Sequence, residues 1–106
     1  MFRYNARMKH GGCVYIITNQ YHNVLYTGVT AELRTRIWEH KTKFYPKSFS
    51  AKYNCDKIVW YQVFPRIEEA IEMEKRIKGG SRKNKETLIK NLNPPWKDLW
   101  EDVQDL

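Results

Sequence analysis

Residues 13–30 read Cys-Val-Tyr-Ile-Ile-Thr-Asn-Gln-Tyr-His-Asn-Val-Leu-Tyr-Thr-Gly-Val-Thr, and this stretch decides the fold. Residues 13–18 and 24–28 are rich in β-branched and aromatic side chains, and the Asn-rich segment between them is typical of a turn. The stretch therefore predicts a β-hairpin. Tyr15 and Tyr26 fall near the middle of its strands, and Gly28 is expected where the second strand meets a following helix.

The residues after the hairpin predict a helix, a loop and a third strand. Thr30 is a candidate cap for a helix that begins near residue 31. Beyond Lys41 the helical pattern fades into a basic, aromatic loop that runs to about residue 56. Residues 57–64 are apolar at both parities, which favours a strand that is covered on both faces and central in its sheet.

Two more helices and a tail complete the expected architecture. A helix is predicted over residues 67–78, where Gly79-Gly80 stops it, and another follows its cap at Ser81. The inner face of this last helix is expected to carry Leu88, Ile89 and Leu92. After Pro94-Pro95, the Trp-rich segment 96–103 is expected to fold back as a short helical tail.

Length and composition favour one small domain. The chain of 106 residues is 42% hydrophobic and 14% aromatic, which supplies a core and excludes global disorder. We expect a flexible leader over residues 1–10 and a domain over residues 11–106. The sequence has no apolar run of membrane-spanning length and no secretory signal, so a cytoplasmic protein without a membrane partner is expected. Cys13 and Cys55 are expected to be reduced thiols.

The charge is strongly basic and unevenly spread. The formal net charge is +7, and because residues 93–106 carry −3, residues 1–92 carry +10. Such a surface favours a polyanionic partner, since binding to phosphates releases counterions. Charge alone does not choose between nucleic acid, membrane headgroups and solubility.

Glu74 is an anomaly on the predicted helix 67–78. At 100° per residue it falls within the apolar stripe formed by Ile67, Ala70, Ile71 and Ile77. A buried carboxylate needs a compensating cation, a hydrogen-bond network or a metal. The alternative to a functional site is a structural ion pair with one of the many Lys or Arg residues.

Arg36 and His40 form a second anomaly, on the predicted helix after the hairpin. They are i, i+4 neighbours that border the stripe of Leu33 and Ile37, whereas Arg34, Glu39 and Lys41 can point outward. Taken alone, His40 is typical of a hydrogen-bonded histidine at a core edge and Arg36 of a snorkelling side chain. Together with an inward Glu74 they form a charged constellation that packing alone rarely retains.

Basic residues interleaved with aromatics are the candidate contacts to phosphates. They lie in the loop after residue 40 and in the segment 75–85, and a solvated basic face is the alternative interpretation. The candidates are Lys41, Lys43, Lys47, Lys52, Lys78, Arg82, Lys83 and Lys85.

Taken in order, these motifs resemble the GIY-YIG nuclease superfamily, and most closely its small stand-alone bacterial members. The resemblance covers about residues 12–100. Two positions depart from the pattern, because the first motif reads Cys13-Val14-Tyr15 and the second Tyr26-Thr27-Gly28. The motifs are Val14-Tyr15-Ile16, Tyr26-Thr27-Gly28, Leu33 with Arg36, His40, Ala70-Ile-Glu-Met-Glu74, Lys78-Gly-Gly-Ser-Arg82 and Leu92-Asn-Pro-Pro-Trp96.

The resemblance implies an α+β fold, a three-stranded antiparallel sheet flanked by helices, with the site where hairpin, first helix and second helix meet. It implies that Glu74 ligates a divalent cation, Mg²⁺ or Mn²⁺, and that Arg36 stabilises charge on the phosphate. Tyr15, Tyr26 and His40 would position and deprotonate the attacking water, and which is the base stays open. The family also implies a late Asn near the site, for which Asn84 and Asn91 are candidates.

The resulting hypothesis is a metal-dependent endonuclease that hydrolyses DNA, with RNA not excluded and repair or recombination intermediates as expected substrates. A nucleic-acid-binding module that kept the fold without cleavage is the main alternative. A structural interaction protein that uses its Trp-rich tail is a third class.

Overall fold

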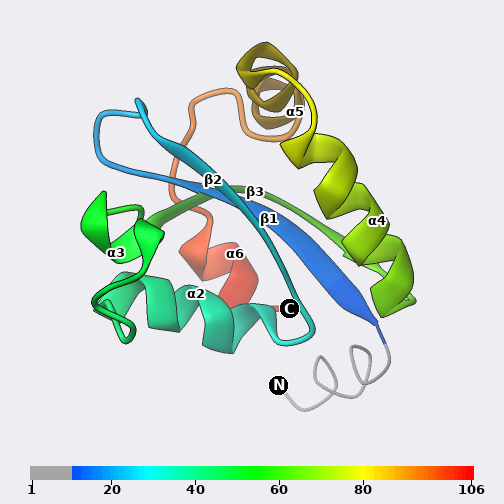
Figure 1. Cartoon of the computed structure of the whole chain (residues 1–106), viewed down its shortest axis with the longest axis horizontal. Helices are drawn as coiled ribbons and strands as arrows, with labels where there is room; N and C mark the ends of the chain where they lie inside the picture. The colour runs from blue at the N-terminus through cyan, green and yellow to red at the C-terminus, as the bar shows by residue number, and fades with distance from the viewer. Residues whose placement is uncertain (1–10) are drawn as a thin grey trace.

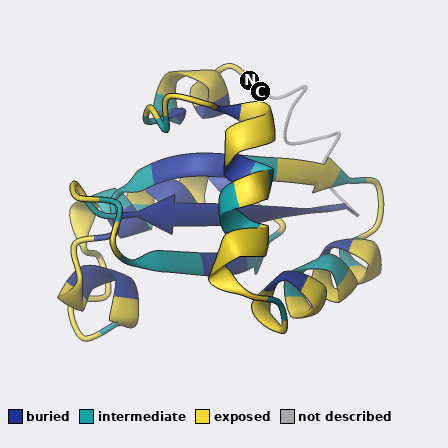
Figure 2. Cartoon of the chain, turned by 90° about the horizontal axis from the view of Figure 1, so that it is seen from above, coloured by how far each residue is buried: buried dark blue, intermediate teal, exposed yellow. Residues whose placement is uncertain are grey.

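The computed structural model describes residues 11–106, and the predicted leader at residues 1–10 lies outside them. Three strands form one antiparallel sheet in the order β2-β1-β3, with β1 at Gly12–Thr18, β2 at Leu25–Thr30 and β3 at Lys57–Phe64. Every residue of β1 is buried, whereas the outer strands are buried only in part (Figure 2). The expected sheet with flanking helices is confirmed.

Helices cover both faces of this sheet (Figure 1). One face packs against α2 (Leu33–Thr42), α3 (Phe49–Lys52) and α6 (Trp100–Gln104), and the other against α4 (Ile67–Lys78) and α5 (Arg82–Leu92). The alternation of β1 divides the core accordingly. Cys13, Tyr15 and Ile17 face the α2 side, while Val14 and Ile16 face the α4 side.

The third strand lies at an edge of the sheet, so its predicted central position is wrong. Ile58, Val59 and Trp60 are buried in succession because helices cover both faces, a pattern that mimics a central strand. The C-terminal tail also covers the outer edge. The N–H of Leu99 donates to the Ile58 carbonyl, and the N–H of Ile58 donates to the Asp98 carboxylate.

Gly28 lies inside β2 opposite Tyr15, and not at the predicted strand-to-helix junction. A Cβ atom at this position would overlap the hydroxyl and ring of Tyr15. The glycine is therefore required by the close approach of the Tyr15 side chain and not by a turn. Thr30 ends β2, and its hydroxyl accepts from the N–H of Glu32 before α2 begins at Leu33.

The second half of the fold follows the predictions with a few differences. Helix α4 has the predicted bounds, and Ser81 caps α5 through the N–H of Asn84. Ile71 and Leu92, expected on inner faces, are instead exposed. The apolar stripe of α4 is centred on Ala70 and Ile77, so Glu74 borders the stripe and does not occupy its middle.

The tail and the thiols behave as expected. Trp96 packs against the α4 side of the core and Trp100 against the α2 side, so both are used within the domain. Cys13 and Cys55 are free, and burial raises the pKa of their thiols to about 12 and about 11. Within residues 11–106, every helix is too short or too polar to span a membrane.

We expect Gly28→Ala to lower the free energy of unfolding by about 1–3 kcal/mol, because the added methyl group overpacks the contact with Tyr15. The matched control is Gly79→Ala, where the new Cβ would lie 3.4 Å from the nearest atom and the backbone is already helical. Urea unfolding of both variants measures the difference. An unchanged stability for Gly28→Ala would contradict the packing role.

Candidate active site

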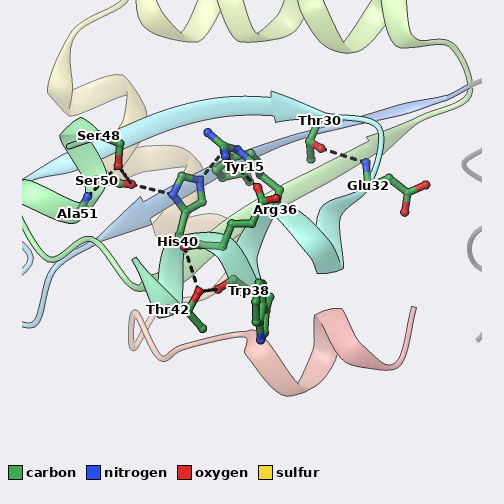
Figure 3. A network of polar contacts seen from close by, with 11 residues as sticks. Tyr15, Thr30, Glu32, Arg36, Trp38, His40, Thr42, Ser48, Ser50 and Ala51 are labelled. Atoms are coloured by element: carbon green, nitrogen blue, oxygen red, sulfur yellow. Dashed lines mark hydrogen bonds and ion pairs between the residues drawn. The ribbon is translucent and has the colours of Figure 1, made fainter. Parts of the chain in front are cut away.

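Tyr15 is the centre of the candidate site. Its side chain crosses Gly28 on the α2 face of the sheet and is only 1% exposed. Its hydroxyl lies 2.8 Å from Nε2 of His40 (Figure 3). Burial raises the pKa of Tyr15 well above its usual value, and the charge and hydrogen bond of Arg36 oppose this rise. Tyr15 is therefore a neutral phenol that contacts one imidazole and one guanidinium.

His40 joins the two motif tyrosines. It lies on α2 as the helical spacing predicts, and it is 5% exposed. Its ring centroid is 5.5 Å from that of Tyr15 and 5.8 Å from that of Tyr26. Burial, with the charge of Arg36 in support, lowers the pKa of His40 to about 4. The imidazole is thus neutral at neutral pH and can accept a proton.

Arg36 lies on α2 one turn before His40, and its guanidinium contacts the Tyr15 hydroxyl. Its guanidinium forms an ion pair of 3.0 Å with Glu39 and lies 5.7 Å from the centroid of the Tyr45 ring. Burial acts to lower the pKa of Arg36, but Glu39 and Tyr15 outweigh it and raise that pKa. The prediction that Glu39 is an ordinary outward charge is wrong, because its carboxylate holds the guanidinium.

Glu74 comes from α4, on the opposite face of the sheet. Its side chain is 13% exposed and pairs with Lys78 at 2.7 Å. The same ammonium lies 5.9 Å from the centroid of the Tyr26 ring. The expectation that the hairpin, α2 and α4 meet on one face is therefore wrong, because α2 and α4 cover opposite faces of the sheet. The two sides approach each other at the free edge of β2, where Lys78 contacts both Glu74 and Tyr26.

A groove of about 300 Å³ follows this free edge. Tyr26 and Phe49 stack along it with ring centroids 5.9 Å apart. Thr27 replaces an apolar residue of the family motif, and its hydroxyl is the one buried side-chain polar group within residues 11–106 that lacks a hydrogen-bond partner. The groove can thus offer aromatic rings and two cations to a ligand. Its lining residues are Leu25, Tyr26, Thr27, Phe49, Lys78 and Lys85.

The residues at the β2 edge can bind a divalent cation through one protein ligand, the carboxylate of Glu74. Within residues 11–106, no three His, Cys, Asp or Glu side chains lie close enough together to hold a metal ion. The Glu74 carboxylate is a hard oxygen donor that already binds one cation, the Lys78 ammonium. Mg²⁺ is compatible with this arrangement, since it often binds through one carboxylate, several waters and substrate phosphates.

The predicted phosphate contacts divide into two groups. Lys41 is bound to Asp98 at 2.5 Å and to the Asp56 carbonyl, and Arg82 to Glu86 and to the carbonyl oxygens of the β1–β2 turn. These two side chains already have partners within the fold, and their role as phosphate contacts stays a prediction. The others on the protein surface are Lys43, Lys47, Lys52 and Lys83, and the groove holds Lys78 and Lys85.

Neither candidate asparagine joins the tyrosine cluster. Asn84 and Asn91 both lie on α5, across the sheet from His40. Asn93 is buried instead, and its amide donates to the carbonyls of Val59 and Lys97. It anchors the tail to β3 and has no contact with the site.

Ser50 is the residue of the site that sequence reasoning missed. Its hydroxyl lies 2.8 Å from Nδ1 of His40, and the side chain is buried. It belongs to α3, a four-residue helix within the predicted loop, which is too short to show helical periodicity. The cap residue Ser48 was the available signal, since its hydroxyl accepts from the N–H of Ala51.

Comparison with known proteins agrees with this geometry. A search of curated proteins gave no match. Among solved structures, the chain is similar to the UPF0213 protein BH0048 from Bacillus halodurans, determined in solution by NMR. The two share 27% sequence identity over 83% of this chain and 92% of that one, with a TM-score of 0.53.

The profile of the GIY-YIG catalytic domain matches residues 11–87, which include the hairpin and helices α2 and α4. This family of nucleases acts on nucleic acid, in keeping with the basic surface. With Tyr15, Tyr26, Arg36 and His40 gathered at one place, the chain belongs to the GIY-YIG catalytic domain family.

Proposed function

We propose that the chain is a divalent-metal-dependent endonuclease that hydrolyses phosphodiester bonds in DNA, with repair or recombination intermediates as substrates. The observation that carries the proposal is the hydrogen bond between buried Tyr15 and neutral His40, next to a charged Arg36. A phenol bonded to a neutral imidazole can take a proton from water as it passes its own proton to the ring, and a guanidinium beside it can bind the phosphate under attack.

Arg36 controls access to Tyr15 in this proposal. In the free protein the guanidinium is held by Glu39, and Tyr15 is almost completely buried. A phosphate oxygen can replace the Glu39 carboxylate as the anionic partner of Arg36, because both accept bidentate hydrogen bonds from a guanidinium. This exchange moves the guanidinium off the phenol and lets the attacking water approach it.

Proton transfer then runs from water to Tyr15 Oη as the phenol proton passes to His40 Nε2. The water oxygen forms the new bond to phosphorus, and the leaving oxygen departs from the opposite side. Imidazolium formation is unfavourable in the free protein, where burial and Arg36 keep the pKa of His40 near 4. A bound phosphate brings negative charge to the site and so favours the imidazolium.

Glu74 is proposed to hold Mg²⁺ or Mn²⁺ at the β2 edge, in exchange for the Lys78 ammonium. The ion would supply charge neutralisation on the phosphate and leaving oxygen. Lys78 and Lys85 line the groove beside Glu74, where both would contact the phosphate backbone.

A binding module that does not cleave is the second candidate. The Glu74–Lys78 ion pair favours it, since a carboxylate neutralised by a lysine can be structural. The tail offers no comparable support for the third class, an interaction protein, because Trp96 and Trp100 pack within the domain. Cleavage assays with Mg²⁺ on single-stranded, duplex, flapped and branched DNA, with matching RNA as a separate arm, decide between enzyme and binder.

Glu74→Gln is expected to abolish cleavage, because it removes the anionic oxygen at nearly constant volume. The stability should change by no more than about 1 kcal/mol, since Lys78 is half exposed. The matched control is Glu72→Gln, an exposed position on the same helix, which should cleave at the parental rate. Cleavage by Glu74→Gln at the parental rate would refute the metal role.

Arg36→Ala should lower the single-turnover cleavage rate by a factor of about 10² or more. Affinity for DNA should fall only modestly, because ground-state binding is spread over many other cations. Arg36→Lys keeps the charge without the planar fork and should recover only part of the rate. A loss confined to affinity would show that Arg36 anchors the substrate and does not act on the transition state.

The neutral His40 predicts a pH dependence of stability. Its pKa is about 4 in the folded protein and 6.5 in an ordinary setting, so the unfolded chain binds the additional proton between these values. The free energy of unfolding should therefore fall as the pH drops below 6.5. Urea unfolding from neutral pH to about 5 tests this, and His40→Gln should show a shallower decline. Equal slopes for both proteins would contradict the assignment.

A further inference from the structure

The hydrogen bond between Tyr15 and His40 continues beyond the imidazole into α3. Nδ1 of His40 lies 2.8 Å from the Ser50 hydroxyl, which lies 3.3 Å from the hydroxyl of Ser48 (Figure 3). Ser48 in turn accepts from the N–H of Ala51. Four side chains thus form one chain of hydrogen bonds from the centre of the sheet to the cap of a short helix.

The direction of this chain follows from Tyr15. Its hydroxyl proton is buried and needs an acceptor. Arg36 can only donate, and within residues 11–106 the acceptor in hydrogen-bond contact with the Tyr15 hydroxyl is Nε2 of His40. Tyr15 therefore donates to Nε2, and this nitrogen carries no hydrogen.

The protonation of the other ring nitrogen is then determined. A neutral imidazole with a bare Nε2 carries its hydrogen on Nδ1, which donates to the Ser50 oxygen. The hydroxyl of Ser50 donates onward to Ser48, whose oxygen has a lone pair left beside the one that receives Ala51. The protons of the three buried members, Tyr15, His40 and Ser50, each have an acceptor within the chain when all the bonds run from Tyr15 towards Ser48.

We infer that Ser50 is a positioning residue that, together with Tyr15, selects the Nδ1–H tautomer of His40, because it accepts the hydrogen that this tautomer carries on Nδ1. The role rests on the proposed function, in which Nε2 receives the Tyr15 proton. In the opposite tautomer Nε2 would carry a hydrogen and donate it to the Tyr15 oxygen across 2.8 Å, so the Tyr15 proton would lose its acceptor and could not pass to the ring.

A purely structural role is the competing explanation, since a buried hydroxyl also stabilises α3. Ser50→Ala keeps the side-chain volume nearly constant, and Ser50→Thr retains the hydroxyl. The matched control is Thr42→Val, which removes an exposed hydroxyl from the helix that carries His40, where it contacts only the carbonyls of Trp38 and Glu39. Dispersion of the amide NMR spectrum reports whether each variant is folded.

The test combines ¹⁵N NMR of the histidine ring nitrogens in the substrate-free protein with single-turnover cleavage. In the parent, His40 should show a protonated Nδ1 and a bare Nε2. Ser50→Ala leaves the Nδ1 hydrogen without its acceptor, so part of the His40 population should shift to Nε2–H, and the cleavage rate should fall at least about 10-fold with unchanged affinity for DNA. Ser50→Thr and Thr42→Val should keep the parental tautomer and most of the rate.

Each contrary result overturns a defined part of the inference. A parental His40 with Nε2–H, or a folded Ser50→Ala that retains Nδ1–H, refutes tautomer selection. A changed tautomer with the parental cleavage rate refutes the positioning role. A parent protein that cleaves no substrate refutes the proposed function. The NMR spectra need no substrate, so they decide the tautomer of His40 even in that case.

Discussion

The packing of Tyr15 across Gly28 is the contact on which the rest of the site depends. It places a phenol at the centre of the sheet, in a space that exists only because β2 has no side chain there. A buried hydroxyl without a hydrogen-bond partner would lower the free energy of unfolding by about 1–3 kcal/mol. His40 meets this need, and so one polar contact within an apolar core joins β1 to α2, while Gly28 of β2 packs against the same ring.

Helical spacing correctly predicted features that depend on a single helix, namely its bounds and the direction of its side chains. Arg36 and His40 are turned towards the sheet as their spacing indicates, and the bounds of α4 were predicted from residues 67–78 alone. The position of Glu74 was predicted less well, because Ile71 lies outside the stripe and moves its centre away from the carboxylate. Periodicity therefore describes a helix face, but not which neighbour covers it.

Contacts between distant segments account for most of the errors. Gly28 was assigned to a turn because its reason, the ring of Tyr15, is on another strand. The edge position of β3 was missed since burial by helices and tail resembles burial by strands. Ser50 lies in a helix of one turn, where no period can be detected. Lys41 appeared to be a free cation until Asp98, far along the chain, was placed beside it.

The C-terminal tail covers one edge of the sheet, at β3, and leaves the other edge, at β2, uncovered. Asp98 and Leu99 bind the backbone N–H and carbonyl of Ile58, so a further strand cannot pair with β3 at this residue. The matched catalytic domain ends at residue 87, before this segment begins. A chain truncated at residue 87 would retain every candidate catalytic residue, but it would leave the backbone groups of Ile58 at the edge of β3 unpaired. The C-terminal segment thus covers part of the outer edge of β3, and the edge of β2 is the open side of the sheet.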